Sequence, residues 1–163
     1  SSIFSYKKYT IVHNGTIDNF NQIRRSLMEK LSDEFFLSIK GNTDSECLFF
    51  LIMEYVHSGN GMSLIEAIKK AFECIVNAQS SQKDPSLSRL NIVITDGSEM
   101  IATRFSSKGS NTLSLSYARS DDNSVIVASE PLDNHLNEWD EVPVNHYLLI
   151  KNNGKTLNIM SFD

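Results

Sequence analysis

Two short polar motifs in the first third of the sequence carry the residue types needed to bind and polarise a small substrate. An apolar stretch leads into His13-Asn14-Gly15, and Asp44 stands at the start of an apolar, helix-like segment. The side-chain amide of Asn14 and the backbone N–H of Gly15 could stabilise an oxygen that gains negative charge during acyl transfer. The carboxylate of Asp44 suits a ligand ammonium group. Together, these residues indicate an acyl-transfer site.

Each of these residues also has a purely structural interpretation. Asn14-Gly15 is a common hairpin turn, but residues 16–20 lead into a helical pattern, so no partner strand follows. Asp44 is an acidic residue in the first turn of a helix, where the helix dipole favours it. Because Thr43 supplies the cap, we expect Asp44 to be free to point elsewhere. His13 is either a substrate-contacting side chain and general base, or a buried structural histidine at the end of a strand.

The spacing of apolar residues predicts the elements that position these motifs. A buried strand is expected over residues 9–12, and a helix capped by Asp18 or Asn19 follows it. A second helix begins at Thr43, where Thr43 and Glu46 fit a capping box. A third helix is expected from about Ser63 to Ala78.

After a polar connector over residues 80–85 the apolar period changes from 3.6 to 2, which predicts strands. These strands are expected over residues 90–95, 100–105, 113–117, 125–129, 147–150 and 156–160. Asp96-Gly97 between the first two is a strong hairpin signal. Helices early in the chain and strands late indicate an α+β domain.

Composition excludes several classes of protein. The chain has 163 residues and a net charge of −5, which argues against nucleic acid or an anionic membrane as a partner. Cys47 and Cys74 lie in apolar helical patterns, so we expect core thiols in a reducing, cytoplasmic compartment. The histidines lack metal-ligand spacing, and we expect neither a metal nor a cofactor. The longest apolar run, residues 47–53, is too short to span a bilayer.

A longer series of motifs recurs in the same order in one protein family. The motifs are Phe4-Ser5-Tyr6, Asn14-Gly15-x-Ile17-x-Asn19-Phe20, Thr43-Asp44-Ser45-Glu46-Cys47, Pro85-Ser86-Leu87, Val93-x-Thr95-Asp96-Gly97-Ser98, Val127-Ala128-Ser129-Glu130-Pro131-Leu132 and Trp139-x-x-Val142-Pro143-x-Asn145. The chain resembles the class II glutamine amidotransferases, which are N-terminal-nucleophile hydrolases with an αββα sandwich. Within that family it is similar to the amidotransferase subunit of the fungal glutathione-degrading complex.

The resemblance implies roles for the residues of both motifs. Asn14 and Gly15 would form the oxyanion hole, and Asp44, with His13 nearby, would bind a glutamine or γ-glutamyl group. The family's nucleophile is an N-terminal Cys, and an Arg binds the substrate carboxylate. Both lie upstream of the His-Asn-Gly motif, and Ser1 is a poor substitute. We therefore expect residues 1–163 to be the C-terminal portion of one amidotransferase domain, incomplete at its N-terminus, inactive alone and of doubtful independent stability.

The expected function is hydrolysis of a γ-glutamyl amide or peptide bond through a glutamyl-thioester, in the degradation of glutathione or related compounds. The resemblance implies a peptidase-type partner subunit, with no nucleic acid or membrane. The alternative is a non-catalytic module with an amidotransferase fold that binds a partner subunit. A biosynthetic enzyme that passes ammonia to a synthase domain is less expected, because no such domain follows within the sequence.

Overall fold

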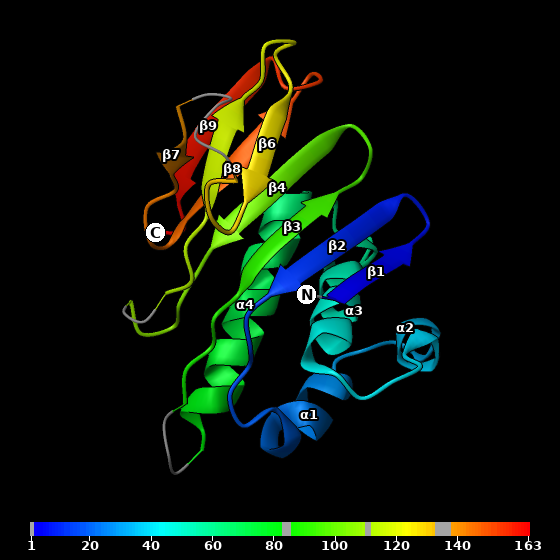
Figure 1. Cartoon of the computed structure of the whole chain (residues 1–163). Coiled ribbons are helices and arrows are strands. Elements are labelled where there is room, and N and C mark those ends of the chain that lie inside the picture. The colour runs from blue at the N-terminus through cyan, green and yellow to red at the C-terminus, as the bar shows by residue number, and fades with distance from the viewer. Residues whose placement is uncertain (1, 83–85, 110–111, 133–137) are drawn as a thin grey trace. The chain divides into compact units, whose positions relative to one another are not determined.

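The computed structural model describes residues 2–82, 86–109, 112–132 and 138–163 (Figure 1). Ser1 and Pro85, which belong to the predictions above, lie outside the described residues. The chain divides into two compact units. Thr16–Ser88 form the helical unit, and Ser1–Gly15 together with Arg89–Asp163 form the sheet unit.

The helical unit contains the three predicted helices and a short additional one. The helices are α1 (Phe20–Met28), α2 (Asp33–Ser38), α3 (Asp44–Val56) and α4 (Leu64–Ser80). Helix α2 was not among the predicted elements. Helix α3 packs against the other three helices, and its residues 45–53 are all buried. Among the described residues, no helix is both long enough and apolar enough to cross a membrane.

Only half of the capping box predicted for α3 is formed. The backbone N–H of Glu46 donates to the side-chain oxygen of Thr43 at 3.3 Å. The Glu46 carboxylate instead accepts bonds from the backbone N–H groups of Lys40, at 3.1 Å, and Gly41, at 2.8 Å. This carboxylate therefore stabilises the turn before α3, because it accepts two backbone N–H groups of that turn rather than the backbone N–H of the N-cap residue Thr43.

The other two long helices begin in different ways. Helix α4 has the complete capping box, formed by Ser63 and Glu66, which the sequence analysis did not identify. Helix α1 begins at Asn19, which takes the left-handed conformation (φ = 56°) and makes no side-chain cap bond. The Asp18 carboxylate does not cap α1 and accepts a bond from the backbone N–H of Leu87 at 3.4 Å.

The sheet unit consists of two antiparallel sheets (Figure 1). The larger sheet has six strands in the order β1-β2-β3-β4-β8-β9, and the smaller has three in the order β6-β5-β7. The strands are β1 (Ser2–Tyr6), β2 (Tyr9–Asn14), β3 (Asn91–Thr95), β4 (Glu99–Arg104), β5 (Ser116–Arg119), β6 (Val125–Ala128), β7 (Asp140–Glu141), β8 (His146–Lys151) and β9 (Thr156–Ser161).

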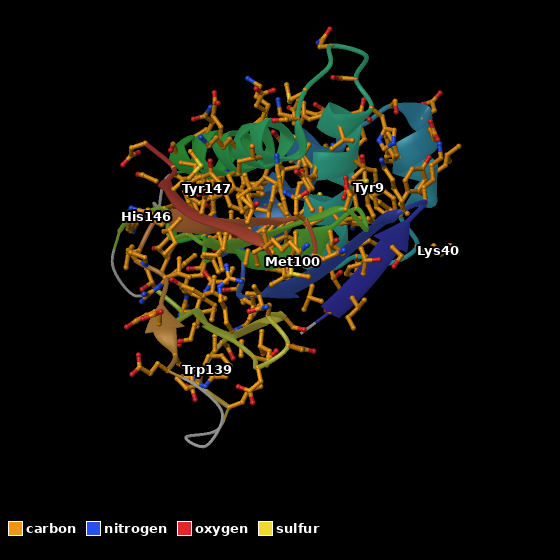
Figure 2. All side chains as sticks on the ribbon, turned by 90° about the horizontal axis from the view of Figure 1, so that it is seen from above. Tyr9, Lys40, Met100, Trp139, His146 and Tyr147 are labelled. Carbon is orange, nitrogen blue, oxygen red and sulfur yellow. The ribbon has the colours of Figure 1, made fainter. Side chains whose placement is uncertain are left out.

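An apolar core joins the two sheets of this unit. Ala102 of β4 and Leu148 of β8 contribute from the larger sheet, and Leu115 contributes from the segment that leads into β5. Met100 packs against this cluster, and Figure 2 shows it among the side chains of the sheet unit. Burial of apolar area is the main force that holds two stacked sheets together. The two sheets are the paired β layers expected of the α+β fold.

Strand β1 and the position of β5 differ from the sequence prediction. Strand β1 pairs with β2 through a turn in which Lys7 takes φ = 51°, and no Gly or Asn marks this turn in the sequence. Strand β5 begins three residues later than predicted. The reason is that the Leu113 carbonyl accepts side-chain bonds from Asn91 and Arg104 at 3.1 and 3.0 Å. The Leu113 carbonyl is therefore paired with side chains rather than with a neighbouring strand.

The turn predicted between β3 and β4 is confirmed. One carboxylate oxygen of Asp96 accepts the backbone N–H groups of Ser98 and Glu99, each at 2.9 Å. Gly97 takes a positive φ of 92°, which suits glycine in a tight turn. Local turn chemistry thus set this hairpin, as the sequence indicated.

Candidate active site

The last two residues of β2 lie on opposite faces of the larger sheet. The burial of β2 alternates, with Tyr9, Ile11 and His13 on the buried side. Val12 and Asn14 line a cavity instead. Because successive side chains of a strand alternate between its faces, the His13 and Asn14 side chains point to opposite faces of the sheet.

The cavity beside Asn14 has a volume of about 150 Å³ and lies wholly within the sheet unit. It is bounded by the ends of β2 and β3 and by segments next to β5 and β6. Its lining residues are Val12, Asn14, Asn91, Ile92, Val93, Ser114, Leu115, Val127, Ala128 and Ser129. None of these described lining residues is acidic or basic, so the cavity presents mainly apolar groups together with amides and hydroxyls.

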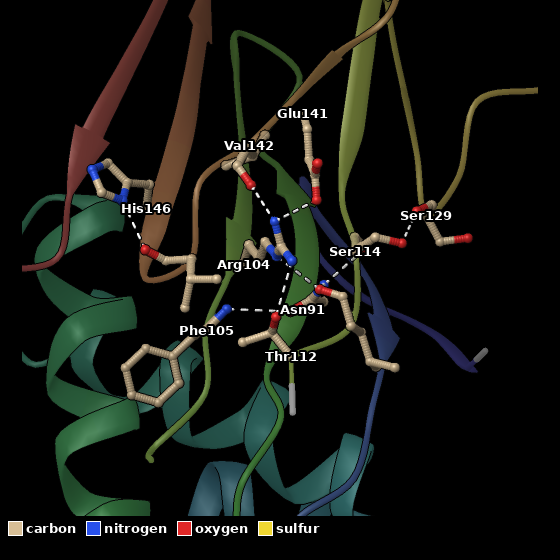
Figure 3. A network of polar contacts seen from close by, with 11 residues as sticks. Asn91, Arg104, Phe105, Thr112, Ser114, Ser129, Glu141, Val142 and His146 are labelled. Carbon is tan, nitrogen blue, oxygen red and sulfur yellow. Dashed lines mark hydrogen bonds and ion pairs between the residues drawn. The ribbon is translucent and has the colours of Figure 1, made fainter. Parts of the chain in front are cut away.

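One wall of the cavity is fastened by side-chain hydrogen bonds (Figure 3). Asn91 is the cross-strand partner of Asn14. Its amide nitrogen donates to the carbonyl oxygens of Leu113 at 3.1 Å and Ser114 at 3.2 Å. The Ser114 hydroxyl in turn donates to the carbonyl oxygen of Ser129 at 2.6 Å. These bonds connect β3 to the segment before β5, and that segment to the one after β6.

Arg104 fastens the same wall from β4 (Figure 3). Its Nε donates to the Leu113 carbonyl, and Nη2 donates to the Thr112 hydroxyl at 2.9 Å. Its Nη1 donates to the Val142 carbonyl at 2.7 Å and to the Glu141 carboxylate at 2.8 Å. Asn91 and Arg104 were not among the predicted site residues. Polar residues at the start and end of two otherwise apolar strands were the available signal.

Gly15 follows Asn14 and passes very close to the backbone of Arg89. It takes φ = 137°, and a Cβ at this position would lie 2.1 Å from the Arg89 carbonyl oxygen. Nε2 of His13 lies 3.4 Å from the same oxygen, and the His13 side chain is 2% exposed. Only glycine fits at position 15, and His13 supports this close approach from the buried side.

Asp44 is anchored within the helical unit, contrary to the expectation that it would be free. Its Oδ2 accepts the backbone N–H of Ile17 at 2.9 Å, and its Oδ1 accepts the backbone N–H of Ser45 at 2.8 Å. Oδ1 also accepts the Ser45 hydroxyl at 3.4 Å. A carboxylate has about four acceptor sites, so Oδ2, with one donor among these bonds, keeps the capacity to accept a further one. The two backbone bonds fix the orientation of this carboxylate on the first turn of α3.

Cys47 has the properties of a structural thiol. Both cysteines are free, and Cys47 is buried. Burial raises the pKa of the Cys47 thiol to about 12, with opposing effects from Arg24 on one side and Asp44 and Glu46 on the other. A thiol with this pKa stays protonated at neutral pH and is a poor nucleophile. In the part of the chain that is described, no three His, Cys, Asp or Glu side chains gather as a metal site would require.

The comparisons with known proteins bear on the class of fold. No protein-family model matches the sequence. The protein named "Probable glutamine amidotransferase DUG3" of Saccharomyces cerevisiae is 31% identical over 185 aligned residues, which cover 91% of this chain and 51% of that protein. The chain therefore spans about half the length of this curated relative.

Two solved structures share the fold at lower sequence identity. The glutamine aminotransferase class-II domain protein of Silicibacter pomeroyi superimposes with a TM-score of 0.83 at 24% identity, over 100% of this chain and 72% of that chain. The glutamine phosphoribosylpyrophosphate amidotransferase of B. subtilis gives 0.65 at 21% identity, over 99% and 31%. The chain has the fold of class II glutamine amidotransferase domains, an N-terminal-nucleophile hydrolase fold. The resemblance drawn from the sequence motifs is confirmed, and the chain is related to the glutamine amidotransferases.

Proposed function

We propose that this protein hydrolyses a γ-glutamyl amide or peptide bond through a glutamyl-thioester, in the degradation of glutathione or related γ-glutamyl compounds. The observation that carries the proposal is the end of β2. There Asn14 lines a cavity, and Gly15 makes an approach to Arg89 that no other residue type allows. The similarity to a relative named as a probable glutamine amidotransferase supports the same chemistry.

In the proposed reaction, a cysteine thiolate attacks the γ-carbonyl carbon of the substrate. The resemblance implies that this cysteine is N-terminal in the family rather than Cys47, which is a buried, protonated thiol. The carbonyl oxygen becomes an oxyanion, which the Asn14 amide and the Gly15 N–H stabilise. The C–N bond then breaks, and the amine takes a proton and departs. A glutamyl-thioester remains on the cysteine. Water attacks the thioester, which releases glutamate and restores the thiol.

Asp44 is proposed to bind the α-ammonium of the glutamyl group. Its two backbone hydrogen bonds hold the carboxylate in one orientation before substrate arrives. A fixed carboxylate loses little conformational entropy on binding an ammonium group. The role predicted for His13 as a substrate contact stays a prediction, and its buried position supports a structural contribution through Arg89.

The proposed setting is the cytoplasm, with a peptidase-type subunit as partner. The resemblance to the amidotransferase subunit of the glutathione-degrading complex supports both parts of this proposal. Co-purification of the native protein with an associated peptidase, identified by mass spectrometry, would test it.

The proposed chemistry is tested by covalent labelling of the full-length polypeptide. A glutamine-mimicking diazo ketone should add one adduct to the intact mass, and peptide mapping should place it on an N-terminal cysteine. Glutamate release from glutamine or glutathione should stop in parallel. A folded protein that takes no label and releases no glutamate would favour the alternative, a non-catalytic module that binds a partner subunit.

A further inference from the structure

Strand β9 is an open edge of the larger sheet. It pairs with β8 on one side, and no other described strand pairs with its other side (Figure 1). The backbone N–H of Phe162 donates to the Asn145 carbonyl at 3.0 Å, which continues the β8–β9 ladder by one pair. Alternate residues of an antiparallel strand bond toward the same neighbour. The residues whose backbone groups point to the open side are therefore Leu157, Ile159 and Ser161.

This edge lacks the features by which natural proteins prevent edge-to-edge pairing. Such features are charged side chains, proline, a bulge or a very short strand. Strand β9 has six residues, none of them charged or proline, and it pairs with β8 without a bulge. Two exposed apolar side chains, Ile159 and Met160, lie on its two faces. The edge is therefore suited to accept another strand.

The charges at the two ends of β9 are opposite. Lys155 directly precedes the strand and Asp163 follows it, and both side chains are exposed. Neither forms an ion pair with another described residue. When two such strands pair antiparallel, the Lys155 end of each lies beside the Asp163 end of the other. Parallel pairing would bring like charges together, which is destabilising. The charge pattern therefore fits an antiparallel second copy.

We propose that β9 of one copy pairs antiparallel with β9 of a second copy, so that the two larger sheets join into one continuous sheet. The register that places Ile159 opposite its own copy also places Leu157 opposite Ser161. Residues that point outward then face each other, as the paired hydrogen bonds of an antiparallel ladder require. Both copies use the same surface, which is the commonest arrangement in soluble oligomers. This proposal is independent of the proposed function.

The other edge of the larger sheet, β1, offers no such charge pattern. Lys7 and Lys8 follow this strand, and no acidic residue lies within it. Antiparallel pairing of two β1 strands would therefore bring no opposite charges together. The charges thus distinguish β9 from β1 as the edge that fits a second copy.

The first test measures the mass of the full-length protein by analytical ultracentrifugation over a range of concentrations. The wild type should be a dimer. Ile159→Lys places two like charges opposite each other on the symmetry axis, so the dimer Kd should rise by roughly tenfold. Leu37→Lys is the matched control, because Leu37 is also an exposed apolar residue and lies on α2. It should keep the wild-type Kd. Circular dichroism checks that both variants are folded.

Charge reversal tests the antiparallel arrangement without altering the strand itself. Lys155→Glu and Asp163→Lys should each raise the dimer Kd by roughly fivefold, because each turns two exposed attractions into repulsions. The double variant should recover the wild-type Kd, since its charges are again opposite. A double variant as weak as either single variant would contradict this arrangement.

A cysteine on the symmetry axis tests the register. Ile159→Cys should form a disulfide between copies under mild oxidation, because the Cα atoms of such a pair lie about 5.5 Å apart, within the range of a disulfide. Thr156→Cys is the control. Its two copies would be separated by six residues of strand, about 20 Å, so it should give no more crosslinked dimer than the wild type.

The outcomes identify what occupies the edge. A wild type that stays monomeric, or a dimer that none of these variants weakens, would overturn the proposal. A monomer whose Ile159 N–H is protected from hydrogen exchange would assign the edge to another segment of the same polypeptide. Loss of a co-purified partner in Ile159→Lys, with a wild type that is monomeric alone, would assign the edge to that partner. Both of these results would overturn pairing with a second copy.

Discussion

Nε2 of His13 lies 3.4 Å from the backbone carbonyl oxygen of Arg89. A Cβ on Gly15 would meet that same oxygen at 2.1 Å. His13 and Gly15 therefore both lie against the backbone of Arg89. This close approach follows directly after Asn14, which lines the cavity. The geometry of this close approach decides where the Asn14 amide is presented.

Replacement of Gly15 by alanine should destabilise the protein more than the same replacement at another glycine of positive φ. Positive-φ strain costs roughly 1–3 kcal/mol, and the collision with Arg89 adds roughly 1–3 kcal/mol of overpacking. Gly97→Ala is the control, because Gly97 has φ = 92° but a methyl group added there would meet no described atom within 4 Å beyond its chain neighbours. Thermal melts of the two variants should therefore differ, and equal melting temperatures would contradict the close approach.

Replacement of Asn14 by alanine should lower kcat of the full-length protein by about 10²–10³, the usual effect of losing one oxyanion donor. The fold should change little, because no side-chain hydrogen bond links Asn14 to another described residue. Asn77→Ala, at an exposed position of α4, should leave kcat unchanged. Wild-type turnover in the Asn14 variant would remove this residue from the mechanism.

Replacement of Asn91 by alanine should cost roughly 1–3 kcal/mol of unfolding free energy, the penalty for leaving buried polar groups unsatisfied. The Phe105 N–H loses its acceptor, and the Leu113 and Ser114 carbonyls lose a donor. Chemical denaturation measures this loss directly. Asn91→Ala should thus differ from Asn14→Ala, which affects turnover more than stability.

Two substitutions of Asp44 separate its structural bond from its proposed role with substrate. Asp44→Asn keeps one oxygen that can accept the Ile17 N–H, but its NH2 group cannot accept the Ser45 N–H and the charge is removed. KM should therefore rise, while the melting temperature falls by less than in Asp44→Ala. Asp44→Ala removes both properties, so KM should rise and the melting temperature should fall. Steady-state kinetics and thermal melts check both variants. A wild-type KM in Asp44→Asn would exclude the ammonium-binding role.

Cys47 should resist alkylation in the native protein. With a pKa of about 12, its thiolate fraction at pH 8 is about one in ten thousand, and only the thiolate reacts. Reactivity should increase only as the pH approaches that pKa. Cys74, which is half-buried and bonded to the Tyr55 hydroxyl at 2.9 Å, should be alkylated first by iodoacetamide. Peptide mapping after short exposure measures the order, and prior modification of Cys47 would contradict it.

The sequence by itself determined the features that depend on local chemistry. Apolar periodicity located α3 and α4, and Asp96-Gly97 determined the hairpin between β3 and β4. The ordered series of motifs, which includes Asn14-Gly15 and Asp44, indicated the class of fold, and the comparisons confirm it. These signals are readable because each arises from residues within one or two turns of one another.

Only the tertiary structure decided which partners the polar side chains find. Asp44 accepts the backbone N–H of Ile17, and Asn91 fastens the segment before β5. Both bonds join residues more than twenty positions apart, so the periodicity of neither segment contains them. A buried backbone group must find an acceptor or donor wherever the fold supplies one. For this reason the wall of the cavity and the anchoring of Asp44 appeared only in the folded chain.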